Sequence, residues 1–586
     1  MKIPSPFDRE RFVGYVSTVT PTSASITFPN PKLLDRFFYD GDILHGGLVG
    51  NYIVIEGYGY GLLAKTIKVQ LPDKLGTYKS LGNLKDSNSH PVGIAEFQLS
   101  FDSFSLEGQG SGIVQYPEIG AKVYACPASI LSRLIDDFGR LSEDESPPDD
   151  LLELACLDSS PAKRIKISAN ALLSRHCAIV GTTGSGKSYT TGKLIEELCK
   201  KDNTKIILLD ATGEFKDYAS ESYCARLSFG DDGDTYFPYQ QLTESDLFAL
   251  FRPSGQVQEP ILQQAIRSLK LAKAIGDSGI VSNGTIRKEG QSKASYNAAY
   301  NEHIETVENI NADFDINKLV QQIELECVWD TDRSTPTKWG GKNESTVAYC
   351  SSLIKRINNL RVKADVSMLF GFKDNLVEGF DSFFNRFESF YSSQDHKLLI
   401  VDLSRISSEA NVKDIFSNAV GRYFLEGVRK QGGLFKEFVR TPLIFMIDEA
   451  HQIFETSRVK DEYSNEFKLD AFEKIAKESR KFGLFLCLST QRPADIPAGV
   501  LSQMGTFIAH RLINERDIQA IKNSVQDSSS GVLSFLPSFG KGQALLTGNE
   551  FPMPIVMQTN EIEGVKPRSQ TPIMFTQTDK ANRTVS

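Results

Sequence analysis

The chain has 586 residues, of which 40% are hydrophobic and 24% are charged, and its formal net charge is −9. This length is expected to give two or three domains, and the acidic balance argues against a protein that coats nucleic acid with a globally basic surface. A basic groove inside an acidic protein stays compatible with these numbers, because local fields govern binding. The eight cysteines form no CxxC pair, which argues against a zinc site or a redox motif.

The N-terminal sequence MKIPSPFDRERF lacks the apolar core of a signal peptide, and no run of ~18 apolar residues follows it. We therefore expect a cytoplasmic protein with no membrane partner.

Residues 1–135 contain many short runs of β-branched and aromatic residues that are separated by turn signals. The runs at 48–55 and 61–71, for example, flank the glycine-rich sequence EGYGYG. Many short strands with such turns are typical of a small β-barrel, which we predict for this segment. The next stretch, 136–161, carries SEDESPPDD and is predicted to be an exposed acidic linker.

From residue 162 onward, apolar strand-like runs alternate with helical patterns, which predicts an α/β core. The near-continuous apolar runs, which suit strands buried on both faces of a parallel sheet, lie at 176–180, 205–210, 397–402, 443–448 and 484–490. We assign 162–245 and 396–564 to this core. Residues 246–395 show apolar residues at helical spacing and are predicted to be an inserted helical subdomain. The polar residues 565–586 are predicted to be a tail that is disordered or orders on a neighbour.

The sequence GTTGSGKS at 181–188 matches the phosphate-binding loop GxxxxGK[ST] in full, between an apolar strand and a helical pattern. In such a loop, backbone N–H groups and the helix N-terminus face the phosphates. Lys187 is expected to reach the β- and γ-phosphates, and the Ser188 hydroxyl to bind Mg²⁺. We therefore predict ATP and Mg²⁺ as cofactors. The residues expected to contact the nucleotide are Gly181, Thr182, Thr183, Gly184, Ser185, Gly186, Lys187, Ser188 and Tyr189.

The sequence LIFMIDEAH places Asp448 and Glu449 where a buried strand ends, beside the phosphate loop. Asp448 is predicted to hold Mg²⁺ through water, and Glu449 to activate the attacking water as a general base. Gln491 ends the next strand and could sense the γ-phosphate or orient water, with a capping turn as the alternative. His451, taken alone, is interpreted as structural.

Spacing alone does not decide the roles of four more polar residues. Arg175 precedes the first core strand and Arg480 precedes the strand at 484–490, so each could supply a transition-state cation or simply a surface salt bridge. Asp210 and Glu214 close the second strand and could order water or form a turn.

Five sequence blocks occur in an order and at spacings that resemble the HerA family of hexameric DNA-translocating ATPases, which are related to FtsK. The blocks are RHCAIVGTTGSGKS, LLDATGEF, LIFMIDEAH, ESRKFGLFLCLSTQRP and VLSQMGTFIAHRL. The resemblance covers about 165–245 and 397–560. It implies a RecA-like P-loop ATPase core with an N-terminal barrel similar to the HAS barrel and an inserted helical subdomain.

The resemblance also implies roles for the candidate residues. Glu449 matches the catalytic base and Gln491 the sensor, while Lys187 and Ser188 match the nucleotide and Mg²⁺ ligands. Arg175 resembles the cis-acting arginine of the family and Arg480 its trans-acting finger. One departure is the charged stretch 451–470, which is longer than the family pattern.

The partners that the resemblance implies are double-stranded DNA, further copies of the chain in a homohexamer, and an effector docked on the barrel. The effector would be a nuclease such as NurA, or a sirtuin-like NAD hydrolase in a bacterial anti-phage defence system. The leading hypothesis is an ATP-driven translocase or helicase on double-stranded DNA. The alternative is a scaffold ATPase whose ATP-bound ring assembles or gates the effector. A small-molecule phosphotransferase fits less well, because it leaves the barrel and the two arginines unexplained.

Overall fold

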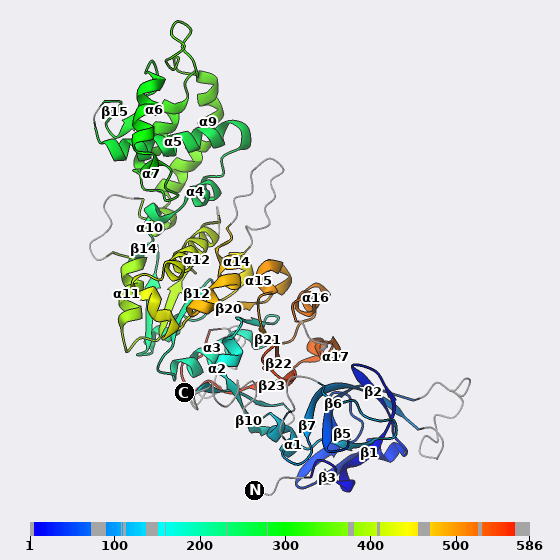
Figure 1. The fold of residues 1–586 in the computed structure, drawn as a ribbon. Coiled ribbons are helices and arrows are strands. Elements are labelled where there is room, and N and C mark those ends of the chain that lie inside the picture. The colour runs from blue at the N-terminus through cyan, green and yellow to red at the C-terminus, as the bar shows by residue number, and fades with distance from the viewer. Residues whose placement is uncertain are drawn as a thin grey trace, which may run out of the picture.

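The protein is described by a computed structural model in which three parts follow one another: a barrel near the N-terminus, a central sheet with its helices, and a helical lobe at the far end (Figure 1). The structure describes residues 5–71, 90–106, 108, 113–135, 150–158, 160–230, 233–277, 279–372, 380–406, 411–454, 469–525 and 530–568.

Antiparallel strands close the N-terminal barrel in the order β1-β2-β7-β6-β5-β8. Their bounds are β1 Phe12–Val19, β2 Ser23–Thr27, β5 Tyr52–Glu56, β6 Tyr60–Gln70, β7 Val92–Asp102 and β8 Lys122–Ala125. The hairpin of β3 (Arg36–Tyr39) and β4 (Asp42–His45) lies beside it. Buried side chains such as Val13, Ile26 and Leu62 fill the interior, and closure leaves the ring of strands without an unpaired edge. The predicted β-barrel is confirmed.

An eleven-stranded sheet forms the core, in the order β10-β9-β23-β22-β21-β11-β20-β19-β12-β18-β13. The strands from β21 to β13 run parallel, and β22, β23, β9 and β10 extend the sheet as antiparallel strands. The parallel strands are β11 Cys177–Val180, β12 Lys205–Asp210, β13 Cys224–Ser228, β18 Leu398–Asp402, β19 Leu443–Ile447, β20 Leu484–Thr490 and β21 Thr506–Ala509. The antiparallel strands are β9 Leu151–Leu157, β10 Ser160–Ser168, β22 Gln543–Gly548 and β23 Ile555–Thr559. The predicted α/β core is confirmed.

Each face of the central sheet has its own helical cover, because alternate strand residues point to opposite faces. Ile206 and Leu208 of β12 belong to the cluster that includes Leu194 of α3 (Lys187–Cys199). Ile207 and Leu209 belong to the cluster that includes α12 (Val412–Lys430). Since both faces are covered, the central strands are buried throughout, as the continuous apolar runs predict.

The interpretation of 136–161 as an exposed linker is wrong for its C-terminal part. Residues of β9 pair with β23, and β10 pairs with β9, so this segment extends the sheet. Leu152 and Leu154 are fully buried, and the acidic sequence before them hid this alternation of buried and exposed residues. The predicted linker residues 136–149 lie outside the described residues.

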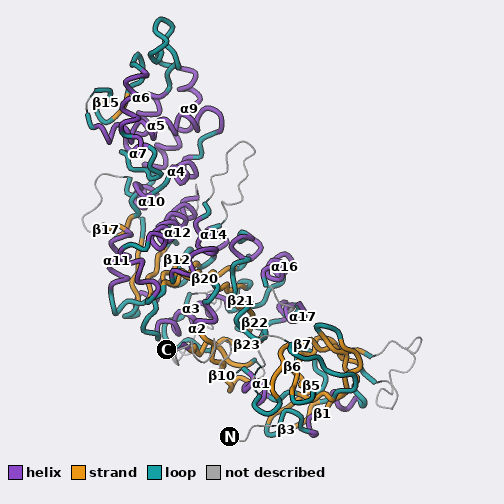
Figure 2. Tube along the Cα trace, viewed as in Figure 1, coloured by secondary structure: helices purple, strands orange, loops and turns teal. Residues whose placement is uncertain are grey.

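Among the described residues, the helical lobe contains seven α-helices, and Figure 2 shows it as a region dominated by helix. They are α4 Glu244–Phe251, α5 Gly255–Ile275, α6 Lys293–Glu302, α7 Ile304–Val307, α8 Leu319–Glu326, α9 Glu344–Val362 and α10 Ala364–Phe370. A short hairpin of β15 (Val281–Ser282) and β16 (Thr285–Ile286) joins them. The chain enters the lobe after β14 (Thr235–Tyr236) and leaves it before β17 (Asp381–Ser382), and these two strands pair with each other.

The last part of the predicted helical insertion belongs to the core. Helix α11 (Phe383–Ser392) packs its aromatic side chains on α12, where the ring centroids of Phe387 and Phe424 are 4.8 Å apart. The helical period alone could not distinguish a lobe helix from a helix that covers the sheet.

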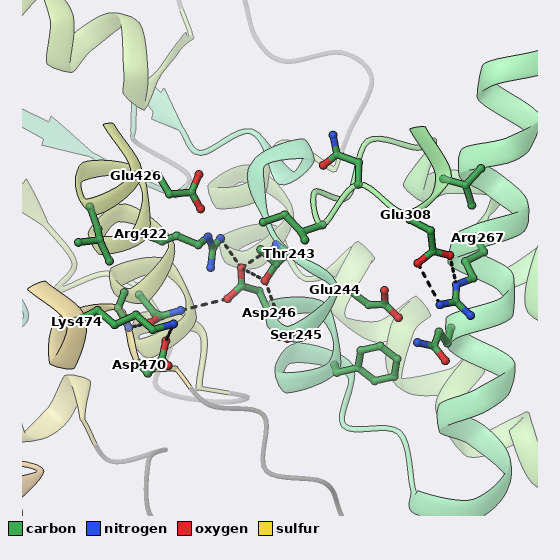
Figure 3. Close-up of a pocket in the computed structure, with 18 of the residues that line it drawn as sticks. Thr243, Glu244, Ser245, Asp246, Arg267, Glu308, Arg422, Glu426, Asp470 and Lys474 are labelled. Carbon is green, nitrogen blue, oxygen red and sulfur yellow. Dashed lines mark hydrogen bonds and ion pairs between the residues drawn. The ribbon is translucent and has the colours of Figure 1, made fainter. Parts of the chain in front are cut away.

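A cavity of about 690 Å³ lies between the lobe and the core, where α4 and α5 face α12 and α14 (Ala471–Glu478). Figure 3 shows Asp246 of α4 and Arg422 of α12 pointing toward each other across this junction. The Arg422 Nη2 donates to Asp246 Oδ2 at 2.6 Å, and Asp246 is fully buried. A buried ion pair therefore ties the lobe to the core.

The remaining helices of the second half of the core are α13 Ala450–Ile453, α15 Ala498–Leu501, α16 Glu515–Ser524 and α17 Ser530–Leu533. Helix α1 (Ala128–Leu134) precedes the first strand of the sheet, and α2 (Ala169–Leu173) lies between β10 and β11. Of the predicted tail, 569–586 lie outside the described residues, whereas Arg568 donates its backbone N–H to Glu214 O at 2.8 Å. Within the described ranges, the helices are too short or too polar to cross a membrane.

Candidate active site

The phosphate loop joins the C-terminal end of β11 to the N-terminus of α3. Gly184 and Gly186 have φ angles of 76° and 117°, in the region that only glycine adopts freely. A Cβ on Gly186 would also lie 3.0 Å from the Cα of Gly542, and the Gly542 N–H donates to Ser185 O at 2.8 Å. The conformation of the loop therefore depends on these glycines and on the turn before β22.

Lys187 lies at the centre of the candidate site, with a side chain that is 3% exposed. Its Nζ is 3.2 Å from Asp448 Oδ1 and 3.0 Å from Glu449 Oε1, and it donates to Ser489 Oγ at 3.0 Å. Burial alone would lower the pKa of Lys187, but the two carboxylates outweigh it and raise the pKa above its ordinary value. The structure thus brings the predicted phosphate-binding lysine and acidic pair together.

Glu449 lies just beyond β19 with a φ of 47°, which is unusual for a residue that carries a Cβ. Gln491 Nε2 donates to Glu449 Oε1 at 2.5 Å, and the Thr183 hydroxyl donates to Gln491 Oε1. A chain of hydrogen bonds therefore runs from the phosphate loop through Gln491 to Glu449. Backbone strain of this kind is common where a side chain must be aimed at a reacting group.

The oxygen atoms around Ser188 fit a Mg²⁺ ion. Glu214 accepts a hydrogen bond from the Ser188 hydroxyl, and both Asp448 Oδ2 and Glu214 Oε2 are buried without a hydrogen-bond partner among the described residues. Hydroxyl and carboxylate oxygens are the ligands that Mg²⁺ prefers. No cluster of three or more His, Cys, Asp or Glu side chains in the described ranges could hold a metal. The few protein oxygens of Ser188, Asp448 and Glu214 suit an ion that is held largely by water and substrate phosphates.

Asp210 and Glu214, whose roles could not be decided from the sequence, have different surroundings. Asp210 accepts backbone hydrogen bonds from Gly213 N at 2.7 Å and Phe215 N at 2.9 Å, so it forms the turn after β12. Burial raises the pKa of Asp210 to about 6. Glu214 is the residue of this pair that faces Ser188, and burial also raises its pKa.

His451 contacts the candidate base rather than the hydrophobic core alone. Its Nδ1 lies 3.2 Å from Glu449 Oε2 and 3.2 Å from Thr490 Oγ1. Burial lowers the pKa of His451 despite the neighbouring carboxylate. A neutral His451 ring therefore lies beside the Glu449 carboxylate and can help to orient it.

Arg175 and Arg480 lie at the opposite edge of the sheet from the phosphate loop. Both precede strands whose C-terminal ends carry the site, and both side chains are exposed. The four residues of β11, at about 3.3 Å each, separate Arg175 from the loop by roughly 13 Å. The structure therefore brings neither arginine close to the phosphate loop of its own chain. The side chain of Arg175 instead lies 3.6 Å from Glu550.

Both arginines lie close to His176, Arg175 as its neighbour in the sequence and Arg480 through space. The charge of Arg480 adds to the burial that lowers the pKa of His176 to about 4, and Gly505 N donates to Arg175 O at 2.9 Å.

Two contacts of the site were not anticipated from sequence. Ser489 bridges Lys187 and Asp448, donating to Asp448 Oδ1 at 2.8 Å, and His510 packs beneath the loop, with its Nδ1 2.9 Å from Gln543 O. Both residues end parallel strands at the same edge as the phosphate loop. Their position at the ends of predicted strands could have identified them from the sequence, since ligands in such sheets bind outside the carboxyl ends of the strands.

Comparison with protein families matches two successive parts of the chain. Residues 153–419 match the family described as "Helicase HerA, central domain", and residues 438–584 match "Helicase HerA-like C-terminal". The chain belongs to the HerA helicase family.

Curated relatives agree with the HerA assignment. A probable helicase of Methanocaldococcus jannaschii is 25% identical over 426 residues, which cover 71% of each chain. The DNA double-strand break repair helicase HerA of Pyrococcus furiosus is 23% identical over 440 residues, which cover 72% of each chain. Among solved structures, the plasmid coupling protein TrwB in complex with ADP and Mg²⁺ is 12% identical, with coverage of 74% and 95% and a TM-score of 0.42. This HerA-family chain is an ATP-hydrolysing enzyme.

Proposed function

We propose that this HerA-family protein is an ATP-driven translocase on double-stranded DNA that works as a homohexameric ring with Mg·ATP between subunits. The separation of the arginines from the phosphate loop carries this proposal. Phosphate transfer requires cations at the γ-phosphate, and in many ring ATPases a neighbouring subunit supplies one. In the proposed ring, Arg480 and Arg175 serve the site of a neighbour rather than that of their own chain.

In the described structure, Glu449 is held by Lys187 and Gln491. Because Lys187 pairs with phosphate oxygens in proteins with this loop, nucleotide would draw Lys187 away from Glu449. The freed carboxylate then accepts a proton from the attacking water, while Gln491 and His451 keep it in position. Mg²⁺ bound by Ser188 and Asp448 would neutralise charge on the phosphates.

The test is ATP hydrolysis by the purified protein with and without duplex DNA, with mass photometry of the same sample. We expect a hexamer whose turnover rises with DNA. Binding that relies on phosphate contacts should also weaken as salt rises. A hexamer with turnover indifferent to DNA would contradict translocation and support a scaffold ATPase that assembles or gates an effector.

We also propose that the barrel carries the effector. Most of the large apolar side chains that are exposed in the described residues belong to the barrel, including Phe38 (81% exposed), Phe104 (79%) and Ile119 (74%). A contiguous exposed apolar patch marks an interaction surface, and we propose that these side chains contribute to one. A nuclease would suit the double-strand break repair named for the relatives, and an NAD hydrolase would suit anti-phage defence. Co-purification with each class of effector, lost on Phe38→Ser with Phe104→Ser, tests this assignment.

A further inference from the structure

A second cavity lies where the barrel meets the core, and it is separate from the phosphate loop. It has a volume of about 710 Å³ and is lined by β5 and β6 on the barrel side and by the segment around 535–543 and β23 on the core side. Figure 1 shows β23 and α17 beside the barrel at this junction. Cavities of this size hold small organic ligands in many proteins.

Lys65 of β6 brings a cation into this cavity. Its side chain is nearly fully buried, and its Nζ lies 5.1 Å from the ring centroid of Tyr52 and 5.2 Å from that of Phe535. Tyr52 belongs to the barrel and Phe535 to the core, and both line the cavity. Burial lowers the pKa of Lys65 to about 8, so most of the ammonium groups keep their charge at pH 7.

Neither of the two carboxylates whose charges act on Lys65 forms a hydrogen bond or ion pair with it. Glu96 is opposite Lys65 in the β6–β7 register, but its Oε1 accepts from Gly531 N at 3.2 Å. Asp158 Oδ1 accepts from Gln543 Nε2 at 2.5 Å. Within the described part of the chain, the Lys65 ammonium has aromatic neighbours but no hydrogen bond or ion pair. The charges of Asp158 and Glu96 act on Lys65 only from a distance, where they oppose the effect of burial on its pKa. A buried ammonium group that makes no hydrogen bond is costly, so this geometry invites an anionic acceptor that bonds to it directly.

We propose that the junction cavity binds a small organic monocarboxylate, with its carboxylate on Lys65 and its apolar body between Tyr52 and Phe535. A single buried cation balances one negative charge, whereas a phosphate dianion would keep an unpaired charge in the cavity. The nearby carboxylate of Asp158 also disfavours a second negative charge. The aromatic walls suit an apolar or aromatic body.

The wall of this cavity continues into the phosphate loop. Gln543 lines the cavity, and its carbonyl oxygen lies 2.9 Å from Nδ1 of His510, which packs beneath the loop. The preceding residue, Gly542, donates its N–H to Ser185 O at 2.8 Å. A ligand that fixes the segment before β22 therefore also fixes one side of the loop, and we expect it to change the affinity for nucleotide.

The experiment is fluorine NMR of the full chain with para-trifluoromethylbenzoate, and with para-trifluoromethylbenzamide as the uncharged control ligand. We expect broadening of the benzoate signal only. Lys65→Met should weaken benzoate binding by about tenfold or more, and Lys68→Met, an exposed lysine of the same strand, should leave it unchanged. Thermal melting checks that both variants fold. A benzoate signal that is unaffected by the protein, or equal binding by Lys65→Met, overturns the proposal.

The link to the phosphate loop has its own measurement. The affinity for a fluorescent ATP analogue is measured with and without saturating benzoate. We expect a change of about twofold or more in the unmodified chain and none in Lys65→Met. Benzoate binding without any change in nucleotide affinity would overturn the link, and neither result depends on DNA translocation.

Discussion

Glu449 is the residue on which the chemistry of the site converges, because one of its carboxylate oxygens contacts both Lys187 and Gln491. Glu449→Gln keeps the size of the side chain but removes its ability to accept the proton. We expect hydrolysis to fall by at least ~100-fold. Binding of ATP should persist or tighten, since Lys187 loses a competing carboxylate. Phosphate release and titration with a fluorescent ATP analogue measure the two effects.

Glu437→Gln is the matched control for this change, because Glu437 is half-exposed and far from the phosphate loop in the fold. Its turnover should equal that of the unmodified chain. Normal turnover by Glu449→Gln would remove the general-base assignment.

His176 provides a pH-dependent prediction at the residue scale. Its ring is buried, with Nδ1 accepting from Leu486 N at 2.9 Å and Nε2 3.0 Å from Ala476 O, which requires a neutral imidazole. Burial lowers its pKa to about 4, below the ordinary 6.5. Between these values the unfolded chain binds a proton that the folded chain does not. The free energy of unfolding should therefore fall by up to about 3 kcal/mol as the pH drops from 6.5 to 4.

Melting curves across this pH range measure the effect. His176→Asn removes the titrating ring at a position whose positive φ asparagine tolerates, so its Tm should depend less steeply on pH. His303→Asn, between α6 and α7, should keep the original slope. Equal slopes for all three proteins would contradict the neutral state of His176.

At the scale of elements, Asp246 connects α4 of the lobe to α12 of the core through three hydrogen-bond donors. It accepts from Arg422, from Asn418 Nδ2 at 3.3 Å, and from Thr243 N at 2.8 Å as part of the capping box of α4. Asp246→Ala would leave Arg422 without its partner and α4 without its cap. We expect a loss of about 3 kcal/mol, measured as a lower Tm and faster hydrogen exchange in α4 and α12.

The ion pair of Arg267 and Glu308, also visible in Figure 3, serves as the control because both side chains are partly exposed. Glu308→Gln should cost less than about 1 kcal/mol. An equal loss in the two variants would mean that the Asp246 pair contributes no more than a surface pair.

Sequence alone predicted the elements that have a strong local signal. The buried runs of β12, β18 and β19 and the strand–loop–helix around 181–188 carry their own periodicity and glycine pattern. Prediction from the sequence failed where the position of a strand or side chain depends on residues that are far away along the chain. β9 is defined by pairing with β23, about four hundred residues later, and Glu214 is close to Ser188 only because two strand ends meet.

At the scale of the whole molecule, the distance between the arginines and the phosphate loop predicts complementation between subunits. In the proposed ring, Arg480→Ala chains lack the finger and Glu449→Gln chains lack the base. In mixed rings, some interfaces join an intact Glu449 to an intact Arg480 of the neighbour. We expect these mixtures to hydrolyse ATP faster than either parent, as measured by phosphate release over a series of mixing ratios. No recovery at any ratio would argue against a finger that acts in trans.

The short parallel pair of β14 and β17 brings together the two points where the chain leaves and re-enters the core. The segment of the chain between β14 and β17, which forms the lobe, therefore begins and ends at neighbouring points. Because the entropy of closing such an excursion grows only slowly with its length, the chain between these strands can be lengthened, shortened or exchanged during evolution with little effect on the sheet. A change in the length of the lobe can therefore leave the strands that carry the catalytic edge where they are, as long as the contacts between α4 and α12 are kept.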